Sequence, residues 1–146
     1  MLRGIDPILS PELLHTLRAM GHGDEIVIAD ANFPGMSVGQ RLIRLDGITA
    51  THVLEAILTL MPLDGFVDKP ANTMQVVDDP AAIPPVVAEF QNIVNNIADN
   101  PATLGTIERF SFYDRAKEAY AVVQTGEDRL YGNIILKKGV IPPKEA

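Results

Sequence analysis

The sequence of 146 residues contains no cysteine. This absence excludes disulfide bonds, thiolate nucleophiles and zinc sites built from thiolates, and it is compatible with a reducing compartment. The sequence also lacks an uninterrupted apolar run near the roughly 18 residues that a membrane-spanning helix requires, and it begins without an apolar segment of signal-peptide length. We therefore expect a soluble, cytoplasmic protein with no membrane partner.

Clusters of basic residues are scarce. The formal net charge is -7, and the only basic cluster is Lys137-Lys138 beside Gly139, which we expect to be the solvated end of a strand. Proteins that bind nucleic acids usually display clustered lysine and arginine side chains that neutralise phosphates. We therefore expect no nucleic-acid partner.

The common nucleotide and metal motifs are also missing. Gly21-His22-Gly23-Asp24 lacks the third glycine of a dinucleotide fingerprint, because Ile26 stands in its place, and it follows an expected helix instead of a strand. There is no GxxxxGK[ST] phosphate loop and no HExxH motif. The spacing of His15, His22 and His52 suits no common metal site. We expect neither a metal nor a cofactor.

The bulk composition is that of a globular protein. Hydrophobic residues make up 47% of the chain and charged residues 21%. A chain of this length suits one compact domain that buries about two thirds of its unfolded surface. We expect a single domain over residues 1–146.

Expected strands and helices alternate along the chain. Ser10 and Pro11 are typical of a helix N-cap and first helical position, and Gly21 ends that helix. The further expected helices run from Thr51 to Pro62, onward from Pro84-Pro85, and for a turn or two within 113–118. The expected strands are 25–29, 40–45, 73–77, 106–110, 120–124 and 133–137. This alternation predicts a layered α/β/α domain with a central mixed sheet.

The first candidate functional residue is His22. Imidazole is the side chain best matched to proton transfer near neutral pH, although a single histidine is more often structural. Its flanking glycines would let a ligand approach the ring closely. The strand that follows ends in Asp30, and we expect this base and this acceptor to lie near each other. His15 and His52 lack such a context, so we expect them on the surface.

Asp30 and Arg109 each have two interpretations. Asp30 either caps the Asp-Ala-Asn loop or accepts hydrogen bonds from a sugar at a strand end, where α/β sheets commonly bind ligands. Arg109 either pairs with an acid such as Glu108 or offers its fixed donors to a polyhydroxylated ligand. The residues alone leave both alternatives open.

A second block of polar groups precedes the last expected strand. Tyr131, Gly132 and Asn133 supply neutral hydrogen-bonding groups, and together with His22 they suggest a sugar-sized polar ligand. The other aromatic residues are expected in the core or at subunit contacts, with two phenols able to exchange a hydrogen bond: Phe33, Phe110, Phe112, Tyr113 and Tyr120.

Five segments, in this order, resemble the bacterial family of ribose pyranases and fucose mutarotases, most closely its fucose branch. They are residues 9–14 (LSPELL), 20–26 (MGHGDEI), 30–34 (DANFP), 109–116 (RFSFYDRA) and 125–140, which includes TGE and YGNIILKKGV. The segments span nearly the whole chain. Asn32 stands where a histidine is expected in the closest fucose enzymes.

The resemblance implies a layered α/β subunit in a ring-like homo-oligomer, typically a decamer, with sites at subunit boundaries. It implies an isomerase that interconverts the α and β anomers of a free monosaccharide such as L-fucose without a cofactor. By matching motif, His22 is the catalytic acid/base, Asp30 and Arg109 bind the sugar, and residues 131–133 complete the pocket. Opening a hemiacetal needs only a positioned histidine with an assisting group or water.

Two alternatives stay open. One is ribose pyranase activity, which exchanges pyranose and furanose forms. The other is a sugar-binding regulatory ring without catalysis, which would be stabilised by its ligand but would exchange no anomers.

Overall fold

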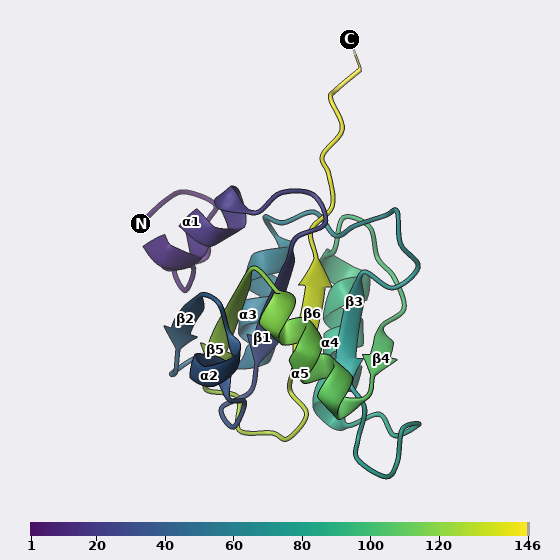
Figure 1. Cartoon of the computed structure of the whole chain (residues 1–146). Helices are drawn as coiled ribbons and strands as arrows, with labels where there is room; N and C mark the ends of the chain where they lie inside the picture. Colours follow the sequence, from purple (N-terminus) through teal and green to yellow (C-terminus); the bar gives the residue numbers. More distant parts are fainter. Residues whose placement is uncertain (146) are drawn as a thin grey trace.

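A six-stranded sheet organises residues 1–145, the part of the chain that the computed structural model describes (Figure 1). The strands are β1 (Glu25–Ala29), β2 (Leu42–Leu45), β3 (Ala71–Met74), β4 (Gly105–Ile107), β5 (Ala121–Thr125) and β6 (Ile134–Lys137). The helices are α1 (Pro11–Ala19), α2 (Gly35–Val38), α3 (Ala50–Leu58), α4 (Pro85–Ile97) and α5 (Arg109–Glu118). In space the strands follow the order β2-β5-β1-β6-β3-β4.

Strand direction decides which loops meet. Five strands run parallel to one another, and only β6, inserted between β1 and β3, runs against them. The carboxyl ends of the parallel strands therefore share one edge of the sheet with the start of β6. We call this the carboxyl edge, and the opposite one, where β1 begins and β6 ends, the amino edge.

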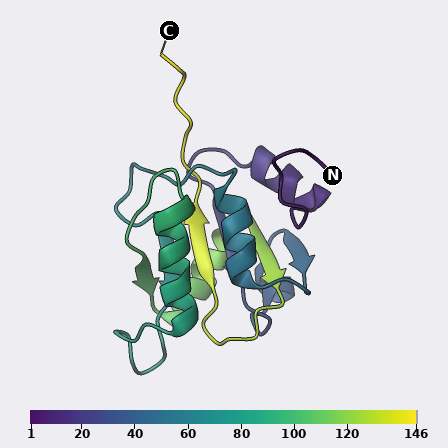
Figure 2. The same cartoon turned by 180° about the vertical axis from the view of Figure 1, so that it is seen from behind.

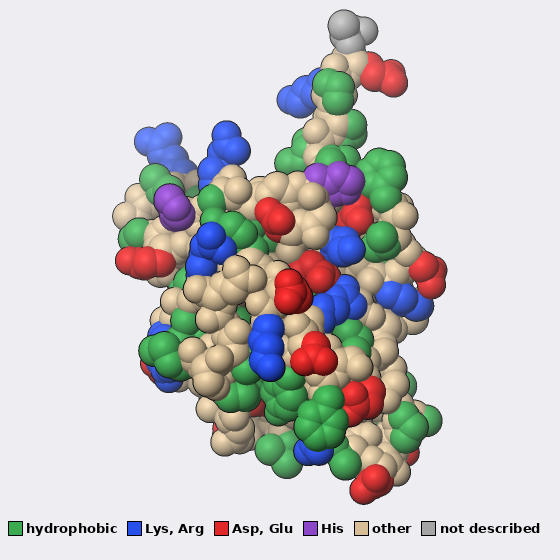
Figure 3. Space-filling view, in the orientation of Figure 1, with side chains coloured by type: hydrophobic (Ala, Val, Ile, Leu, Met, Phe, Trp, Pro, Cys, Tyr) green, Lys and Arg blue, Asp and Glu red, His purple; other side chains and the backbone are tan. Residues whose placement is uncertain are grey.

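Helices cover both faces of the sheet. Helices α3 and α4 lie on one face and α2 and α5 on the other, as the two opposite views show (Figures 1 and 2). Successive strand residues point to opposite faces, so Ile26 and Ile28 pack in the core with α3 and α4, whereas Val27 and Ala29 pack with α5. Acidic and basic side chains are intermixed over the α5 face (Figure 3). The predicted α/β/α layering with a mixed sheet is confirmed.

Several element boundaries differ from those expected. The strand expected over 106–110 ends at Ile107, because the Glu108 carboxylate accepts a hydrogen bond from Ser111 N at 3.0 Å and caps α5. Helix α5 therefore begins at Arg109 and has 10 residues, instead of a turn or two within 113–118. The strand expected over 73–77 is β3, which ends at Met74, and the short helix α2 was not expected.

Lys138 is not the solvated end of a strand that we expected. Its ammonium group donates hydrogen bonds to the carbonyl oxygens of Leu17 and Met20, at 2.8 and 2.5 Å. Burial, and then the charge of Arg18, lower the pKa of Lys138. A cation at this position caps the last carbonyls of α1, so Lys138 joins the end of β6 to that helix.

None of the helices in residues 1–145 is both long and apolar enough to cross a membrane.

Replacing Ser10 by alanine should destabilise the fold. The Ser10 hydroxyl caps α1 by accepting a hydrogen bond from Leu13 N at 3.2 Å, and loss of such a cap costs about 1 kcal/mol. We expect this loss in the free energy of unfolding measured in urea. Asn92→Ala, at an exposed position inside α4, is the control and should cost nothing, because alanine is the better helix former. Equal effects of the two variants would contradict the prediction.

Candidate functional site

A small pocket opens at the carboxyl edge of the sheet. Its volume is about 200 Å³, and it is lined by the loops after β1 and β3, by the first half of α5 and by the turn before β6. Its polar lining includes Asp30, Asn32, Arg109, Tyr131 and Asn133, and Phe33 and Met74 belong to its apolar walls. The pocket therefore unites four of the residues singled out from sequence, with Gly132 adjacent in the chain.

Asp30 and Asn133 form the floor of this site. Asp30 N donates to Asn133 Oδ1 at 2.7 Å, and Asn133 Nδ2 donates to Asp30 Oδ2 at 3.1 Å. Asp30 Oδ1 also accepts from Asn32 N at 3.0 Å, so the loop-capping interpretation holds as well. Burial raises the pKa of the Asp30 carboxyl, and the hydrogen bonds from Asn32 and Asn133 only partly oppose that shift. Hydrogen bonds from the backbone amides of Phe33 and Gly132 oppose the shift as well.

Gln124 supports the loop after β1 and was not recognised from sequence. Its amide donates to the Asp30 carbonyl oxygen at 2.5 Å, and its Oε1 accepts from Gly35 N at 3.2 Å. Both partners lie far from Gln124 in the chain. A glutamine inside a buried strand carries no signal of this role until the neighbouring strand is known.

Glu127 supports the pocket from beneath. Its carbonyl oxygen accepts from Ala31 N at 2.8 Å, and its carboxylate accepts from Arg129 Nε at 3.1 Å. Burial alone would raise the pKa of Glu127, but the hydrogen bonds and charge of Arg129 hold it below its usual range. Glu127 is thus an ionised, paired side chain that ties the loop after β5 to the loop after β1.

Tyr131 adopts a backbone conformation that is unusual for a tyrosine. Its φ is 65°, in the left-handed region, where a residue with a side chain stores about 1–3 kcal/mol of strain. The phenol oxygen accepts a hydrogen bond from Val77 N at 3.1 Å, which leaves the phenol proton available for another acceptor. The strained turn thus holds Tyr131 beside the loop after β3.

Arg109 opens α5 at the rim of the pocket. Its guanidinium lies 4.6 Å from the centre of the Phe110 ring, and within residues 1–145 it forms no ion pair. Glu108, the acid considered as its partner, caps α5 instead. The donors of Arg109 are therefore not occupied by a carboxylate of the same chain.

His22 does not lie near Asp30, so the expectation that β1 brings them together is wrong. His22 precedes β1 and Asp30 follows it, and five extended residues separate these loops by roughly 16 Å. At the amino edge, His22 Nε2 lies 3.1 Å from Asp64 Oδ1, and its ring centre is 5.4 Å from that of Phe66. The side chain is 46% exposed. Gly23, with φ of 88°, provides the turn that follows it.

The predictions for the remaining histidine and aromatic residues are confirmed only in part. His15 and His52 are exposed, as expected, and His52 pairs with Asp6 at 2.9 Å. Within residues 1–145, no three histidine, cysteine or acidic side chains are grouped as a metal site would require. The aromatic residues divide as follows: Phe33 and Phe112 are buried, Phe110 is 62% exposed, Tyr113 lines the pocket against Phe33, and Tyr120 stacks under Arg41.

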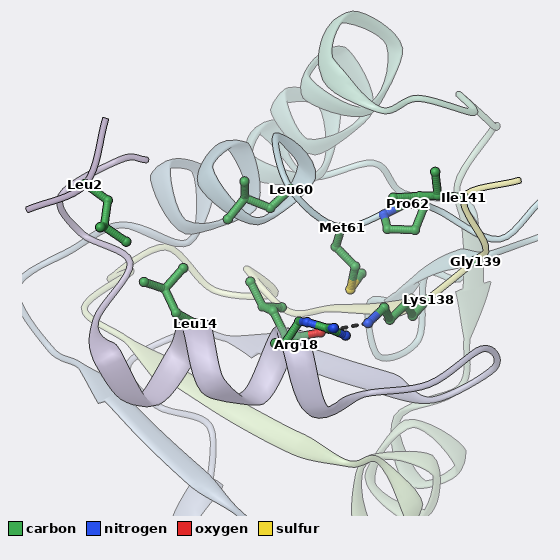
Figure 4. A pocket seen from close by; sticks show the side chains of 10 residues that line it. Leu2, Leu14, Arg18, Leu60, Met61, Pro62, Lys138, Gly139 and Ile141 are labelled. Atoms are coloured by element: carbon green, nitrogen blue, oxygen red, sulfur yellow. Dashed lines mark hydrogen bonds between the residues drawn. The ribbon is translucent and has the colours of Figure 1, made fainter. Parts of the chain in front are cut away.

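A larger cavity of about 580 Å³ lies elsewhere, between α1, the turn after α3 and the segment after β6 (Figure 4). Leu14, Leu60 and Met61 face it, and the ammonium group of Lys138 at its edge is occupied by α1 carbonyls. None of the site residues predicted from sequence lines this cavity. Its apolar walls offer few partners to a polyhydroxylated ligand.

The fold and the carboxyl-edge pocket define a mixed α/β protein with a small polar pocket. The chain belongs to the RbsD / FucU transport protein family, whose model matches residues 3–141. It is 51% identical over 142 residues to the L-fucose mutarotase of Haemophilus influenzae (strain 86-028NP), covering 97% of this chain and 99% of that protein.

Two solved structures of similar proteins can be compared with this chain. The fucose mutarotase of Streptococcus pneumoniae in complex with L-fucose has a TM-score of 0.90 and 46% identity, over 97% of this chain and 100% of the other. RbsD of Bacillus subtilis complexed with D-ribose has a TM-score of 0.73 over 97% of this chain and 99% of the other. At 24% identity, that second similarity supports the shared fold alone.

Replacing Gly132 by alanine should distort the pocket. A Cβ there would lie 2.8 Å from Glu127 Cγ and 3.5 Å from Asp30 Cβ, and overpacking of this kind costs about 1–3 kcal/mol. We expect that loss in the free energy of unfolding measured in urea. Gly47→Ala is the control, because no atom lies within 4 Å of the added Cβ. A Gly132 variant that behaves like the Gly47 variant would refute the tight contact.

Proposed function

We propose that the protein is an L-fucose mutarotase, an isomerase that interconverts the α and β anomers of the free sugar. The observation that carries the proposal is the pocket formed by Asp30, Arg109, Tyr131 and Asn133 in a chain that is 51% identical to an L-fucose mutarotase. The similar fucose mutarotase structure contains L-fucose, which supports this sugar as the substrate.

The pocket suits a monosaccharide in size and chemistry. Its volume of about 200 Å³ is below the roughly 300–1,000 Å³ of sites for drug-sized ligands. Asp30 and Asn133 present acceptors and a donor, Arg109 presents unpaired donors, and Phe33 offers an apolar wall. This combination can bind the hydroxyl groups of a sugar and also contact its carbon face.

The proposed acid/base, His22, must come from a second copy of the chain. Within one copy the length of β1 keeps His22 at the amino edge and the pocket at the carboxyl edge. Proton transfer requires a separation of about 2.6–3.2 Å or one bridging water. If the amino edge of one copy meets the carboxyl edge of the next, each site receives its own histidine.

Exposed apolar residues at both edges support such a contact. Phe66 beside His22 is 76% exposed, and Val77 and Leu130 at the pocket are 42% and 65% exposed. Contiguous exposed apolar groups mark interaction surfaces. A contact between two different edges closes into a ring if the rotation from copy to copy closes, and otherwise it gives an open filament. We therefore propose that the protein is a cytoplasmic, ring-like homo-oligomer. We expect a decamer, as the resemblance to this family implies.

The proposed reaction opens and recloses a hemiacetal. His22 removes the proton of the anomeric hydroxyl while the ring oxygen receives a proton, and the bond between the anomeric carbon and the ring oxygen breaks. Tyr131, whose phenol proton is not engaged by Val77, is positioned to supply the second proton. The aldehyde turns, and closure with reversed proton transfers gives the other anomer. Each positioned group contributes about 10²–10⁴-fold.

Exchange NMR on equilibrated L-fucose tests the activity. The wild-type protein should transfer saturation between the anomer signals faster than buffer does. His22→Ala should lower the rate by about 10²–10⁴-fold without changing the oligomer mass. The same experiment with D-ribose reports pyranase activity through furanose signals. Thermal stabilisation by L-fucose without faster exchange of any sugar would identify a binding protein and refute the proposal.

Mixed oligomers test the origin of the histidine. In a 1:1 co-assembly of His22→Ala and Asp30→Asn chains, one copy supplies an intact histidine and its neighbour an intact pocket in about a quarter of the shared sites. We expect about a quarter of the wild-type exchange rate at L-fucose concentrations well below the dissociation constant of the Asp30→Asn variant, where each variant alone exchanges far more slowly. If the mixed oligomer exchanged anomers no faster than either variant alone, His22 and Asp30 would have to act within one chain.

Sugar affinity should depend on the protonation of Asp30. Because burial raises its pKa, the carboxyl gains a proton at a higher pH than an ordinary aspartate does. As the pH falls through this pKa, an acceptor is lost and the dissociation constant for L-fucose should rise. Above that pKa, the affinity should be independent of this group.

Calorimetric titrations with L-fucose across the acid range would measure this dependence. Asp30→Asn should bind L-fucose about 10–100-fold more weakly near neutral pH, the scale of a hydrogen bond to a charged group. Its affinity should no longer fall as the pH is lowered. Asp46→Asn, an exposed aspartate paired with Arg44, is the control and should retain the wild-type profile. If the affinity of Asp30→Asn for L-fucose still fell at low pH, Asp30 would not be the group responsible.

A further inference from the structure

Asp64 is a buried carboxylate directly beside the proposed acid/base. It is 3% exposed, and its Oδ1 lies 3.1 Å from His22 Nε2 and accepts a hydrogen bond from Phe66 N at 3.2 Å. Nothing in the sequence pattern pointed to this residue, because it lies 42 positions away from His22.

The backbone fixes this carboxylate in place. Asp64 N donates to Lys137 O at 3.0 Å, and Gly139 N donates to Pro62 O at 2.8 Å, so the loop after α3 is anchored to the end of β6. A Cβ on Gly139 would lie 2.8 Å from Asp64 Cα, which means that the two segments are in close contact. Asp64 thus has a rigid base, whereas His22 stands on a loop between two glycines.

Other charged groups near His22 are already occupied. The Asp24 carboxylate accepts from Gly21 N at 2.7 Å, and the Lys138 ammonium group bonds the carbonyl oxygens at the end of α1. Asp64 is therefore the carboxylate that contacts the imidazole. The other ring nitrogen, Nδ1, has no hydrogen-bond partner within residues 1–145.

We propose that Asp64 is a positioning residue for His22, which holds the ring orientation and the tautomer protonated at Nε2 and thereby leaves Nδ1 as the reacting atom. A carboxylate accepts but does not donate, so the neutral imidazole must give its proton to this hydrogen bond. The inference rests on the proposed mutarotase function and specifies which nitrogen performs it.

The proton balance follows from this geometry. Nδ1 takes the proton of the anomeric hydroxyl while the ring opens, and the resulting imidazolium is paired with the Asp64 carboxylate. When the ring recloses, Nδ1 returns the proton to the carbonyl oxygen, which becomes the anomeric hydroxyl again. Asp64 stabilises the charged histidine without exchanging a proton, as the acid of a hydrolase triad does.

Two measurements on the intact oligomer test this role. Nitrogen-15 NMR of the histidine rings in the wild-type protein should find His22 protonated at Nε2, with Nδ1 free. Asp64→Asn should lower kcat for L-fucose anomer exchange by about 10–100-fold, the scale of the loss when a metal-bound histidine loses its orienting partner. The KM should stay unchanged, because Asp64 does not touch the sugar.

Asp6→Asn is the matched control. Asp6 and His52 form a comparable pair at 2.9 Å, with side chains 30% and 45% exposed, away from the pocket residues, so this variant should keep wild-type kcat and KM. Asp64→Glu should recover part of the lost rate, because it restores the negative charge.

Each outcome decides the matter. The positioning role would be overturned if His22 of the wild-type protein were protonated at Nδ1, or if the Asp64→Asn variant kept full kcat. It would also be overturned if the KM of that variant rose as much as its kcat fell. In all these cases the wild-type protein would still exchange anomers, so the proposed function would stand. A wild-type protein without exchange would overturn the proposed function, and this inference with it.

Discussion

The pair of hydrogen bonds between Asp30 and Asn133 is the interaction on which the site depends. It exists because β6 runs against its neighbours: Ile134 is paired with Ile28, so the residue before β6 meets the residue after β1. If β6 ran parallel to β1, Tyr131 and Asn133 would begin their strand at the amino edge. The direction of one strand thus decides that the two polar blocks of the sequence form a single pocket.

The same strand geometry separates the histidine from that pocket. The strand over 25–29 was predicted correctly from its β-branched residues, yet the prediction that His22 lies near Asp30 was wrong. Closeness in sequence does not imply closeness in space, because an extended chain rises about 3.3 Å per residue. A glycine-flanked histidine at one end of a strand and a carboxylate at the other end cannot share a ligand within one copy.

Local signals predicted much of the fold. Ser10-Pro11 marked the start of α1, and Pro84-Pro85 that of α4, because capping and proline act within one turn. Glu108 was missed as a cap because Ile107 and Phe110 around it suggested a strand. Gln124 and Asp64 could not be predicted, since their partners Asp30 and His22 are 94 and 42 residues away. Such contacts are created by the strand order and not by local pattern.

The two buried acids at the carboxyl edge differ in a way that explains their separate roles. Glu127 has a cation beside it, and Arg129 holds its pKa below the usual range. Asp30 has only neutral donors, so burial raises its pKa. A paired carboxylate has little to gain from a ligand, and Glu127 therefore serves the structure of the loops. An unpaired buried carboxylate carries a desolvation cost that further hydrogen bonds from hydroxyl groups would reduce. This difference supports the proposal that Asp30, and not Glu127, binds the sugar.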